Sequence, residues 1–406
     1  MRSADRERTR MVDALRTSGR ICSGPVEQAF RAVPRHAFLP GTPIEAAYAD
    51  EALTVQRRAG VATSSASQPS MMAIMLEQLD LRPGHRVLEI GAGTGYNAAL
   101  MAHVVGAAGS VTAVDIDAEL VSSAAAHLAA AGMAGVELIC ADGALGHPPR
   151  APYDRIVLTV CSVDVRPEWV AQLAEGGRLL LPLAVLGSQL SVALDLGADG
   201  ILRSGSVRGC SFIRLRGIGA GSDATVRPVD GLLIAVPESR GGVDPHAVAA
   251  ALAAPGPARR LPVSLGASDV WDGFGLWLAL TEPGTVRLLA HDDHPFSARM
   301  FAPGPAGGVT VALVVDAGLA VVLRGDGTGD GTGDGTVDAE VQAFGPGGAT
   351  AAELVLAAAR RWVDGGSPSS AELEVAVVPR GHPVPWPGAA RVDKEHSTVQ
   401  LRPGSR

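Results

Sequence analysis

Between residues 86 and 196, short apolar runs alternate with longer stretches whose apolar residues recur at helical spacing. The apolar runs predict buried strands at 87–90, 111–114, 136–139 and 156–160. The stretches between them predict helices at 96–105 and 118–131. Strands that alternate with helices in this way indicate an α/β fold with a Rossmann-like, doubly wound parallel sheet. Further strands are expected at 177–183 and 190–196, the second running antiparallel at the sheet edge.

The flanking segments have other patterns. Residues 1–80 predict a helical prelude and a loop, which we assign to the same domain as the core at 81–217. The glycine-rich sequence GIGAGSD at 217–223 predicts a linker. Beyond it lie β-like runs and one helical stretch, at 309–315, 319–324, 374–378 and 349–363. We therefore expect a separate α+β domain at 223–406.

Composition narrows the class of protein. The chain has 406 residues, of which 47% are hydrophobic, and a net charge of −8. This excludes a wholly disordered chain, and the acidic charge argues against a nucleic-acid partner. The longest apolar stretch, 179–194, is shorter than the roughly 20 residues of a membrane-spanning helix. A charged N-terminus and four widely spaced cysteines predict a cytoplasmic protein without a membrane partner.

The sequence VLEIGAGTGYN at 87–97 is the strongest local signal. A buried strand leads into a glycine-rich turn that opens a helix, so free N–H groups at the helix start can face a ligand. Asp115 follows Gly95 by twenty residues and ends the next strand, where an acid can accept both ribose hydroxyls of a nucleoside. A nucleoside-containing ligand is therefore expected at this end of the sheet.

Two ligands fit this turn. A dinucleotide prefers G-x-G-x-x-G/A, which the chain matches from Gly93, but Glu89 and Gly91 then stay unexplained. A G-x-G-x-G turn preceded by an acid suits S-adenosyl-L-methionine, and Asp142, after the following strand, can accept the adenine amine. We favour S-adenosyl-L-methionine, with S-adenosyl-L-homocysteine as product, over a dinucleotide or a turn that binds nothing. The residues expected to bind it are Glu89, Gly91, Gly93, Gly95, Asp115, Ile116, Asp142 and Gly143.

Several separated motifs accompany this turn. They are VPRHAF at 33–38, AYAD at 47–50, ATSSASQPSM at 62–71, APYD at 151–154, QLAEGG at 172–177 and CSFIRLRG at 210–217. With VLEIGAGTGYNAA they resemble the protein-L-isoaspartate O-methyltransferase family over roughly residues 10–217. The resemblance implies a class I methyltransferase that uses S-adenosyl-L-methionine.

The resemblance also implies an active-site loop. Ser67 matches the serine of the family's T-I-S-x-P motif, although Ser65 and Ala66 replace the threonine and isoleucine. Further substrate contacts are implied for Ser64, Ser65, Gln68, Pro69, Val160 and Cys161. A peptide carboxylate is already ionised at neutral pH, so it can attack a methyl group without a general base. We expect Ser67 to orient the substrate, because no G-x-S-x-G elbow makes it a hydrolase nucleophile.

The substrate stays open between three interpretations. The added domain at 223–406 favours one dedicated partner, because a general repair enzyme needs only the catalytic domain. Relatives with such extensions resemble tailoring enzymes of ribosomally made peptides, whose aspartyl methyl ester collapses to an aspartimide or isoaspartate. We therefore expect carboxyl methylation of an aspartyl or isoaspartyl residue in a precursor peptide. The alternatives are general repair of isoaspartyl residues in damaged proteins and a binding module without turnover.

Two remaining patterns have simpler interpretations. The GDGT repeat at 325–336 can form a calcium loop, but an expanded hairpin loop is the simpler prediction. The sequence HDDH at 291–294 can hold a metal, but no strand or helix context supports it. We predict no metal site.

Overall fold

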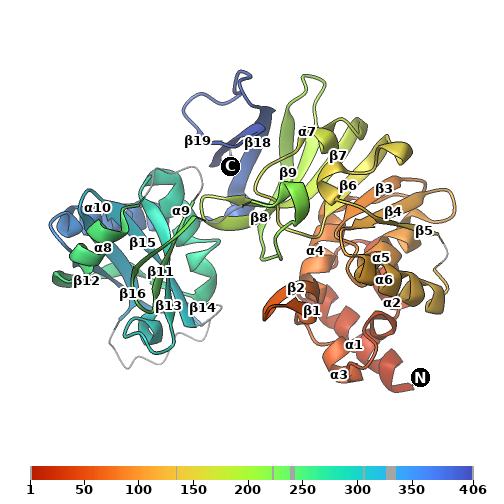
Figure 1. The fold of residues 1–406 in the computed structure, drawn as a ribbon, viewed down its shortest axis with the longest axis horizontal. Helices are drawn as coiled ribbons and strands as arrows, with labels where there is room; N and C mark the ends of the chain where they lie inside the picture. The colour runs from red at the N-terminus through yellow and green to blue at the C-terminus, as the bar shows by residue number, and fades with distance from the viewer. Residues whose placement is uncertain are drawn as a thin grey trace.

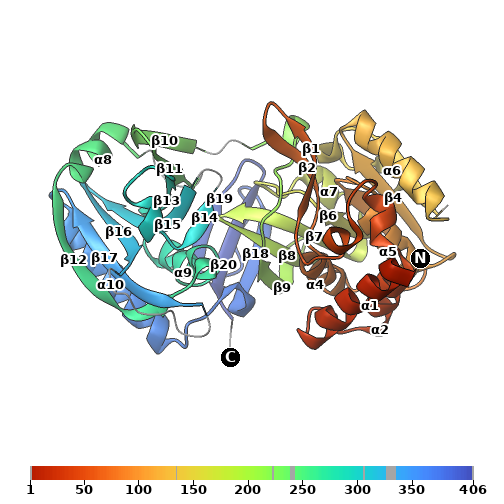
Figure 2. The ribbon, with the colours of Figure 1, turned by 90° about the horizontal axis from the view of Figure 1, so that it is seen from below.

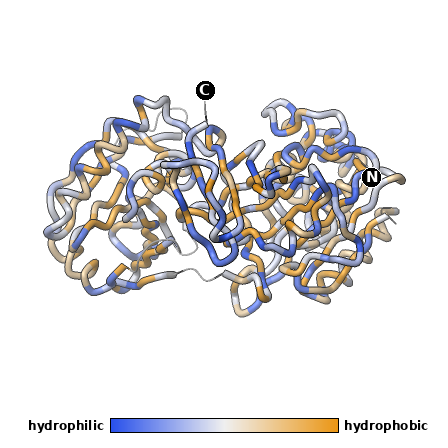
Figure 3. The backbone as a smooth tube through the Cα atoms, turned by 90° about the horizontal axis from the view of Figure 1, so that it is seen from above, coloured by the Kyte–Doolittle hydropathy of each residue, from blue (hydrophilic) through white to orange (hydrophobic). Residues whose placement is uncertain are grey.

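The computed structural model describes residues 2–133, 135–221, 224–237, 243–304, 307–325 and 335–404. Its chain forms two lobes, each built on one large sheet (Figure 1). We call residues 2–221 together with 370–404 the large lobe, and residues 224–364 the inserted lobe. Hydrophobic stretches run along the strands of both lobes (Figure 3), and each lobe buries apolar clusters of its own.

The sheet of the large lobe has ten strands among the described residues, in the order β19-β20-β18-β9-β8-β7-β6-β3-β4-β5. Its parallel half consists of β3 (Arg86–Ile90), β4 (Ser110–Asp115), β5 (Val136–Cys140), β6 (Tyr153–Leu158) and β7 (Leu173–Val185). Its antiparallel half consists of β8 (Ser188–Leu196), β9 (Leu202–Gly209), β18 (Leu373–Pro379), β19 (Ala390–Asp393) and β20 (Ser397–Pro403). The predicted doubly wound sheet is confirmed, and so is the antiparallel course of the strand at 190–196, but its expected place at the sheet edge is wrong because β8 lies between β7 and β9.

Strand order places a ligand site. The chain runs from β3 outward to β4 and β5, and then returns to the other side of β3 as β6. In open α/β sheets, ligands bind beyond the carboxyl ends of the strands at such a switch point. Around it pack α5 (Tyr96–Val105), α6 (Ala118–Ala130) and the short α7 (Pro167–Val170). The helices expected at 96–105 and 118–131 are confirmed.

Residues 2–80 form a helical layer on the large lobe. It contains α1 (Arg2–Thr17), α2 (Gly24–Ala32), α3 (Ile44–Ala47) and α4 (Pro69–Leu79), which share an apolar cluster with α5. A hairpin of β1 (Leu53–Arg58) and β2 (Val61–Ala66) interrupts the helices and projects beside the sheet (Figure 2). The second strand of this hairpin leads directly into the serine loop and then into α4. The hairpin therefore brings the loop to the switch point.

The inserted lobe is an antiparallel sheet with helices against it. Its strands follow the order β10-β11-β13-β15-β16-β17-β12, and β14 pairs with β15. They are β10 (Ala224–Val229), β11 (Leu232–Val236), β12 (Pro255–Leu265), β13 (Thr285–His291), β14 (Ala302–Gly304), β15 (Gly307–Val315), β16 (Gly318–Arg324) and β17 (Val337–Phe344). The helices are α8 (Pro245–Leu252), α9 (Phe274–Thr281) and α10 (Gly348–Asp364). The strands at 309–315 and 319–324 and the helix at 349–363 are confirmed.

The last strands correct the expected extent of the second domain. Residues 223–406 do not all belong to one sheet, because β18 pairs with β9 and so returns the chain to the large lobe. Val375 and Val377 of β18 are buried in the same apolar cluster as Leu179 of β7. Asp164, in the loop after β6, accepts hydrogen bonds from His396 N at 2.6 Å and Ser397 Oγ at 2.5 Å. The second sheet is thus an insertion between β9 and β18.

Other sequence expectations have simple outcomes. Residues 326–334, which hold most of the GDGT repeat, lie outside the described residues, and the flanking β16 and β17 are antiparallel neighbours. His294 Nδ1 accepts a hydrogen bond from Phe296 N at 3.2 Å. Within the described ranges, no three His, Cys, Asp or Glu residues gather as a metal site would require. No helix in this part of the chain combines the length and apolarity needed to cross a bilayer.

Candidate active site

The glycine turn lies at the carboxyl end of β3 and opens α5. Gly91, Gly93 and Gly95 all have positive φ, at +100°, +52° and +85°. A Cβ on Gly91 would lie 2.8 Å from Thr159 Oγ1, so only glycine lets the turn pass β6 this closely. Gly91 and Gly93 line a cavity, but Gly95 does not. A Cβ there would meet Ala124 at 3.2 Å, so Gly95, assigned to the cofactor from sequence, instead lets α5 pack against α6.

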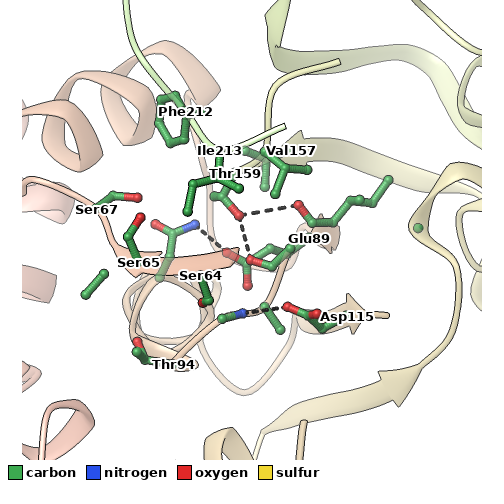
Figure 4. Close-up of a pocket in the computed structure, with 18 of the residues that line it drawn as sticks. Ser64, Ser65, Ser67, Glu89, Thr94, Asp115, Val157, Thr159, Phe212 and Ile213 are labelled. Carbon is green, nitrogen blue, oxygen red and sulfur yellow. Dashed lines mark hydrogen bonds between the residues drawn. The ribbon is translucent and has the colours of Figure 1, made fainter. Parts of the chain in front are cut away.

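The cavity encloses about 1060 Å³ of empty space, part of it open to solvent. One wall is formed by the glycine turn and the ends of β3, β4 and β6, a second by the serine loop, and a third by residues 212–216. Figure 4 shows Ser65 and Ser67 on one side of this space, with Glu89 and Asp115 on the other.

Glu89 is a fully buried acid in the wall of the cavity. Its side chain is 0% exposed, because it lies at the end of the central strand β3. Asn97 Nδ2 donates to Glu89 Oε1 at 2.8 Å, while Oε2 has no partner among the described residues. Burial raises the pKa of Glu89 to about 8, and the like charge of Asp115 acts in the same direction. The site therefore holds an acid that lacks a cation.

The acids at the next two strand ends differ in accessibility. Asp115 lines the cavity and accepts hydrogen bonds from Gly93 N at 3.0 Å and Asp117 N at 3.1 Å. Its neighbour Ile116 also lines the cavity and is 38% exposed, which provides an apolar surface there. Asp142, by contrast, is absent from the lining, although Gly143 belongs to it.

Backbone groups engage both oxygens of Asp142. Ala144 N donates to Oδ1 at 2.9 Å, and Ile218 N, from the segment leading to the inserted lobe, donates to Oδ2 at 2.8 Å. Gly217 lies so close that a Cβ on it would be 2.1 Å from Asp142 Oδ2. Each Asp142 oxygen therefore already accepts one backbone hydrogen bond, and the role expected for the half-buried Asp142 toward adenine stays a prediction.

Only some of the serine-loop residues that the sequence implies as substrate contacts line the cavity. Ser64, Ser65 and Ser67 line the cavity. Gln68 and Pro69 do not, because they form the start of α4, where Gln68 Nε2 donates to Asp50 Oδ2 at 3.2 Å. The loop is thus fixed at one end by the hairpin and at the other by a helix.

Residues after β6 and after β9 complete the site. Val160 lines the cavity, whereas Cys161 is buried behind it and pairs through its backbone with Ile213 and Leu215. This pairing holds residues 212–216 along the open side of the cavity, and all five line it. Arg216 Nη2 lies 3.7 Å from Asp115 Oδ1. No site role follows from the sequence for 212–216, although CSFIRLRG belongs to the motifs quoted above.

Asn97 and Thr159 are further lining residues without a sequence assignment. Asn97 stands eight positions after Glu89 in the glycine motif, and this helical position next to the acid is the signal that could have identified it. Thr159 Oγ1 donates to Gly91 O at 2.6 Å and so fixes the turn.

Comparison with known proteins identifies this arrangement. The family model of protein-L-isoaspartate(D-aspartate) O-methyltransferases (PCMT) matches residues 6–218. The chain belongs to this family. It is 39% identical over 213 residues to the protein-L-isoaspartate O-methyltransferase of Methanopyrus kandleri, a match over 52% of this chain and 92% of the relative. It is 38% identical over 216 residues to protein-L-isoaspartate O-methyltransferase 2 of Archaeoglobus fulgidus, over 52% of this chain and 94% of the relative.

A solved structure extends the likeness in fold. A protein-L-isoaspartate O-methyltransferase structure superposes with a TM-score of 0.50 and 23% identity, covering 91% of this chain and 96% of that one. Coverage this wide includes much of the inserted lobe as well as the large lobe. The architecture, a Rossmann-type methyltransferase fold with an additional sheet-rich region, is therefore shared.

As a member of this family, the protein is an S-adenosyl-L-methionine-dependent methyltransferase. The residues of the cavity fit that cofactor. Glu89 offers a buried carboxylate oxygen without a partner in the described chain, which suits the cationic methionine end. Asp115 lies where ribose hydroxyls can be accepted, and Gly91 and Gly93 keep that wall free of side chains.

Proposed function

We propose that this methyltransferase forms methyl esters on isoaspartyl carboxylates of proteins and peptides, as a general repair enzyme. The observation that carries the proposal is the shared cavity, which Ser67 lines from the substrate loop and Glu89 and Asp115 line from the strand ends. S-adenosyl-L-methionine supplies an electrophilic methyl group when bound. The two acids suit its cationic and ribose parts, which leaves the serine side for the acceptor peptide.

The chemistry asks for positioning more than for acid–base catalysis. The acceptor carboxylate has an unperturbed pKa near 4 and is ionised at neutral pH. Among the described residues that line the cavity there is no histidine, and the carboxylates are Glu89 and Asp115, both on the cofactor side. The Ser67 hydroxyl can donate a hydrogen bond to the acceptor and hold it in line with the methyl group. Residues 212–216 limit access of water from the open side.

Two observations support repair over the dedicated peptide tailoring expected from the sequence. The relatives that match are protein-L-isoaspartate O-methyltransferases. The additional domain was the main argument for a dedicated partner, but a solved protein of that name shares the fold over 91% of this chain. An added lobe is therefore compatible with a protein-L-isoaspartate O-methyltransferase, and tailoring of a precursor peptide becomes the second candidate.

Methyl transfer to matched peptides tests this function. We expect transfer from methyl-labelled S-adenosyl-L-methionine to an isoaspartyl peptide and little to the same peptide with aspartate. A set of unrelated isoaspartyl sequences should show kcat/KM values within about tenfold of one another. Acceptance of a single sequence would favour the tailoring enzyme, and absence of transfer to all of them would refute general repair.

Ser67→Ala tests the assignment of the serine loop. We expect methyl transfer to fall by roughly ten- to a hundredfold, because an orienting hydrogen bond is lost, while the affinity for S-adenosyl-L-homocysteine stays within about twofold. Ser70→Ala is the matched control, since Ser70 lies in the first turn of α4 outside the cavity lining. An equal loss of cofactor affinity in Ser67→Ala would contradict a role toward the substrate.

A further inference from the structure

Arg35 is a buried arginine in the wall of the active-site cavity. It begins a short helical turn at Arg35–Phe38, in the segment between α2 and α3. Its side chain is 0% exposed and lines the cavity. The motif VPRHAF, in which it lies, contributes to the family resemblance but assigns it no role. A buried guanidinium needs an explanation, because charged groups are expensive to remove from water unless they are paired.

The contacts of Arg35 leave part of its guanidinium group without a hydrogen-bond or ion-pair partner. Nε donates to Ala47 O at 2.8 Å, and Nη1 approaches Met72 Sδ at 3.5 Å. Nη2 has no hydrogen-bond partner, and within the described ranges no carboxylate lies at ion-pair distance from the guanidinium. The Tyr96 ring faces it, with 5.3 Å between Arg35 Cζ and the ring centroid. The Tyr96 hydroxyl is also buried without a partner.

The surroundings reinforce the positive potential. Met72 lies in the first turn of α4 and Tyr96 begins α5, so two of the three contacts of Arg35 are at helix N-termini, while Ala47 O lies at the end of α3. Helix N-termini carry partial positive charge. Asp50 accepts from Ser70 N at 2.8 Å and thereby caps α4, but it is exposed and not bonded to Arg35. Burial lowers the pKa of Arg35 from its ordinary value, as expected for a cation without a close counter-ion.

We propose that Arg35 and Tyr96 form a carboxylate-binding subsite of the cavity, a proposal that rests on the proposed function. Arg35 Nη2 and the Tyr96 hydroxyl are unpartnered donors on two side chains that face each other, and such donors match the acceptor oxygens of a carboxylate. Asn97, the residue after Tyr96, holds Glu89. The first turn of α5 therefore contacts both Glu89, an acid without a cationic partner, and Arg35, a cation without an acidic partner.

Two ligands of this enzyme can supply the carboxylate. The amino-acid end of S-adenosyl-L-methionine carries an ammonium and a carboxylate a few bonds apart, and these match Glu89 and Arg35. The acceptor peptide carries the carboxylate that is methylated. In either case Arg35 is a positioning residue whose guanidinium binds an anion and takes no proton in the reaction.

Binding measurements on Arg35→Gln, Arg35→Lys and Tyr96→Phe distinguish these sources. If the donor carboxylate is bound, Arg35→Gln should lose about tenfold or more in affinity for S-adenosyl-L-homocysteine but not for its decarboxylated analogue, which keeps the amine. If the peptide carboxylate is bound, cofactor affinity is unchanged and KM for an isoaspartyl peptide rises about tenfold at unchanged kcat. Arg35→Lys should recover part of either loss, because it keeps the charge.

Arg287→Gln is the matched control. Arg287 is 1% exposed in β13 of the inserted lobe, lies outside the cavity, and also has nitrogens without partners among the described residues. Its substitution should alter thermal stability without changing either affinity. The subsite would be overturned if folded Arg35→Gln kept both its affinity for S-adenosyl-L-homocysteine and its KM for the isoaspartyl peptide, or if it lost affinity equally for S-adenosyl-L-homocysteine and the decarboxylated analogue.

If Arg35→Gln does not fold, two other measurements still test the subsite. Tyr96→Phe removes only a hydroxyl, and the comparison of the two analogues also applies to the wild-type protein. If the wild type binds both analogues equally and Tyr96→Phe leaves the peptide KM unchanged, the subsite is refuted. If the wild type binds no S-adenosyl-L-homocysteine at all, the proposed function fails first, and the two failures are thereby distinguished.

Discussion

Binding of S-adenosyl-L-methionine is expected to expel a proton from Glu89. The carboxyl group is fully buried and accepts one hydrogen bond, from Asn97, while its second oxygen has no partner in the described part of the chain. Burial raises its pKa from 4.5 to about 8, and the nearby Asp115 carboxylate adds to this rise. At pH 7 about nine-tenths of the ligand-free molecules therefore carry the proton.

The size and sign of the effect follow from this pKa. A cationic ammonium or sulfonium beside the carboxylate favours the ionised form, so binding at pH 7 should release close to one proton. Affinity should rise by up to about tenfold per pH unit between pH 6 and 8, and level off above. The apo protein shows the opposite trend. Its folded-state pKa exceeds the unfolded value of 4.5, so stability from this group is lost as pH rises from 4.5 toward 8.

The full shift corresponds to about 5 kcal/mol of unfolding free energy in the absence of ligand. Isothermal titration with S-adenosyl-L-homocysteine in phosphate and in Tris at pH 7 measures the released proton, because the two buffers differ in ionisation enthalpy. Adenosine is the ligand control, since it lacks the ammonium. Glu89→Gln should abolish the buffer dependence, whereas Glu137→Gln, on β5 outside the cavity, should retain it.

A binding enthalpy that is the same in both buffers, together with an affinity that does not change between pH 6 and 8, would refute the reasoning. It would mean that Glu89 is already ionised in the free protein or stays protonated in the complex. Release that persists in Glu89→Gln would assign the proton to a group other than Glu89.

Three further predictions concern stability. Gly91→Ala should lower the unfolding free energy by roughly 1–3 kcal/mol in chemical denaturation, because φ is +100° and the new Cβ would meet Thr159. Gly24→Ala, where the new Cβ meets open space, should change the unfolding free energy by less than about 0.5 kcal/mol. Equal effects of the two substitutions would contradict the strain inferred at Gly91. Asp164→Ala should lower the unfolding free energy by roughly 2–3 kcal/mol, since it leaves His396 N and Ser397 Oγ without their acceptor. An unchanged melting temperature would show that these hydrogen bonds do not hold the last strands to the large lobe. Removal of residues 370–406 should abolish the cooperative thermal transition, because it removes β18–β20 from the large sheet. A soluble product with a normal transition would show that these strands are dispensable.

The first half of the fold could be predicted because its signals are local. A buried run of three apolar residues and one acid, a glycine turn and a following helix lie within twenty positions, and β3, the turn and α5 appear where this pattern puts them. Ser67 directly follows β2 and Glu89 lies near the end of β3, and both residues line one cavity. Short-range periodicity and turn chemistry are enough for this part.

The remainder depends on contacts between distant segments. The pairing of β18 with β9 joins Ala376 to Arg203, and nothing in the periodicity of either strand specifies that partner. Asp142 resembles its counterparts at the other strand ends, but in the folded chain it accepts a hydrogen bond from Ile218 N. Arg35 enters the cavity because the helical turn Arg35–Phe38 folds against α4 and α5, a placement that only tertiary packing determines. Such features cannot be read from a single sequence.

The charge of the cavity follows from what the reaction must bring together. With a net charge of −8, the protein has no long-range attraction for an anionic acceptor. Inside the cavity, Glu89 and Asp115 face the cationic and ribose parts expected of the cofactor, while Arg35 and Arg216 are fixed cations on the surrounding walls. Buried charges interact strongly over short distances and are little screened by salt. We therefore expect recognition of the acceptor carboxylate to depend on contacts near Ser67, on the side of the cavity away from Glu89 and Asp115, and hardly on the acidic surface of the whole molecule.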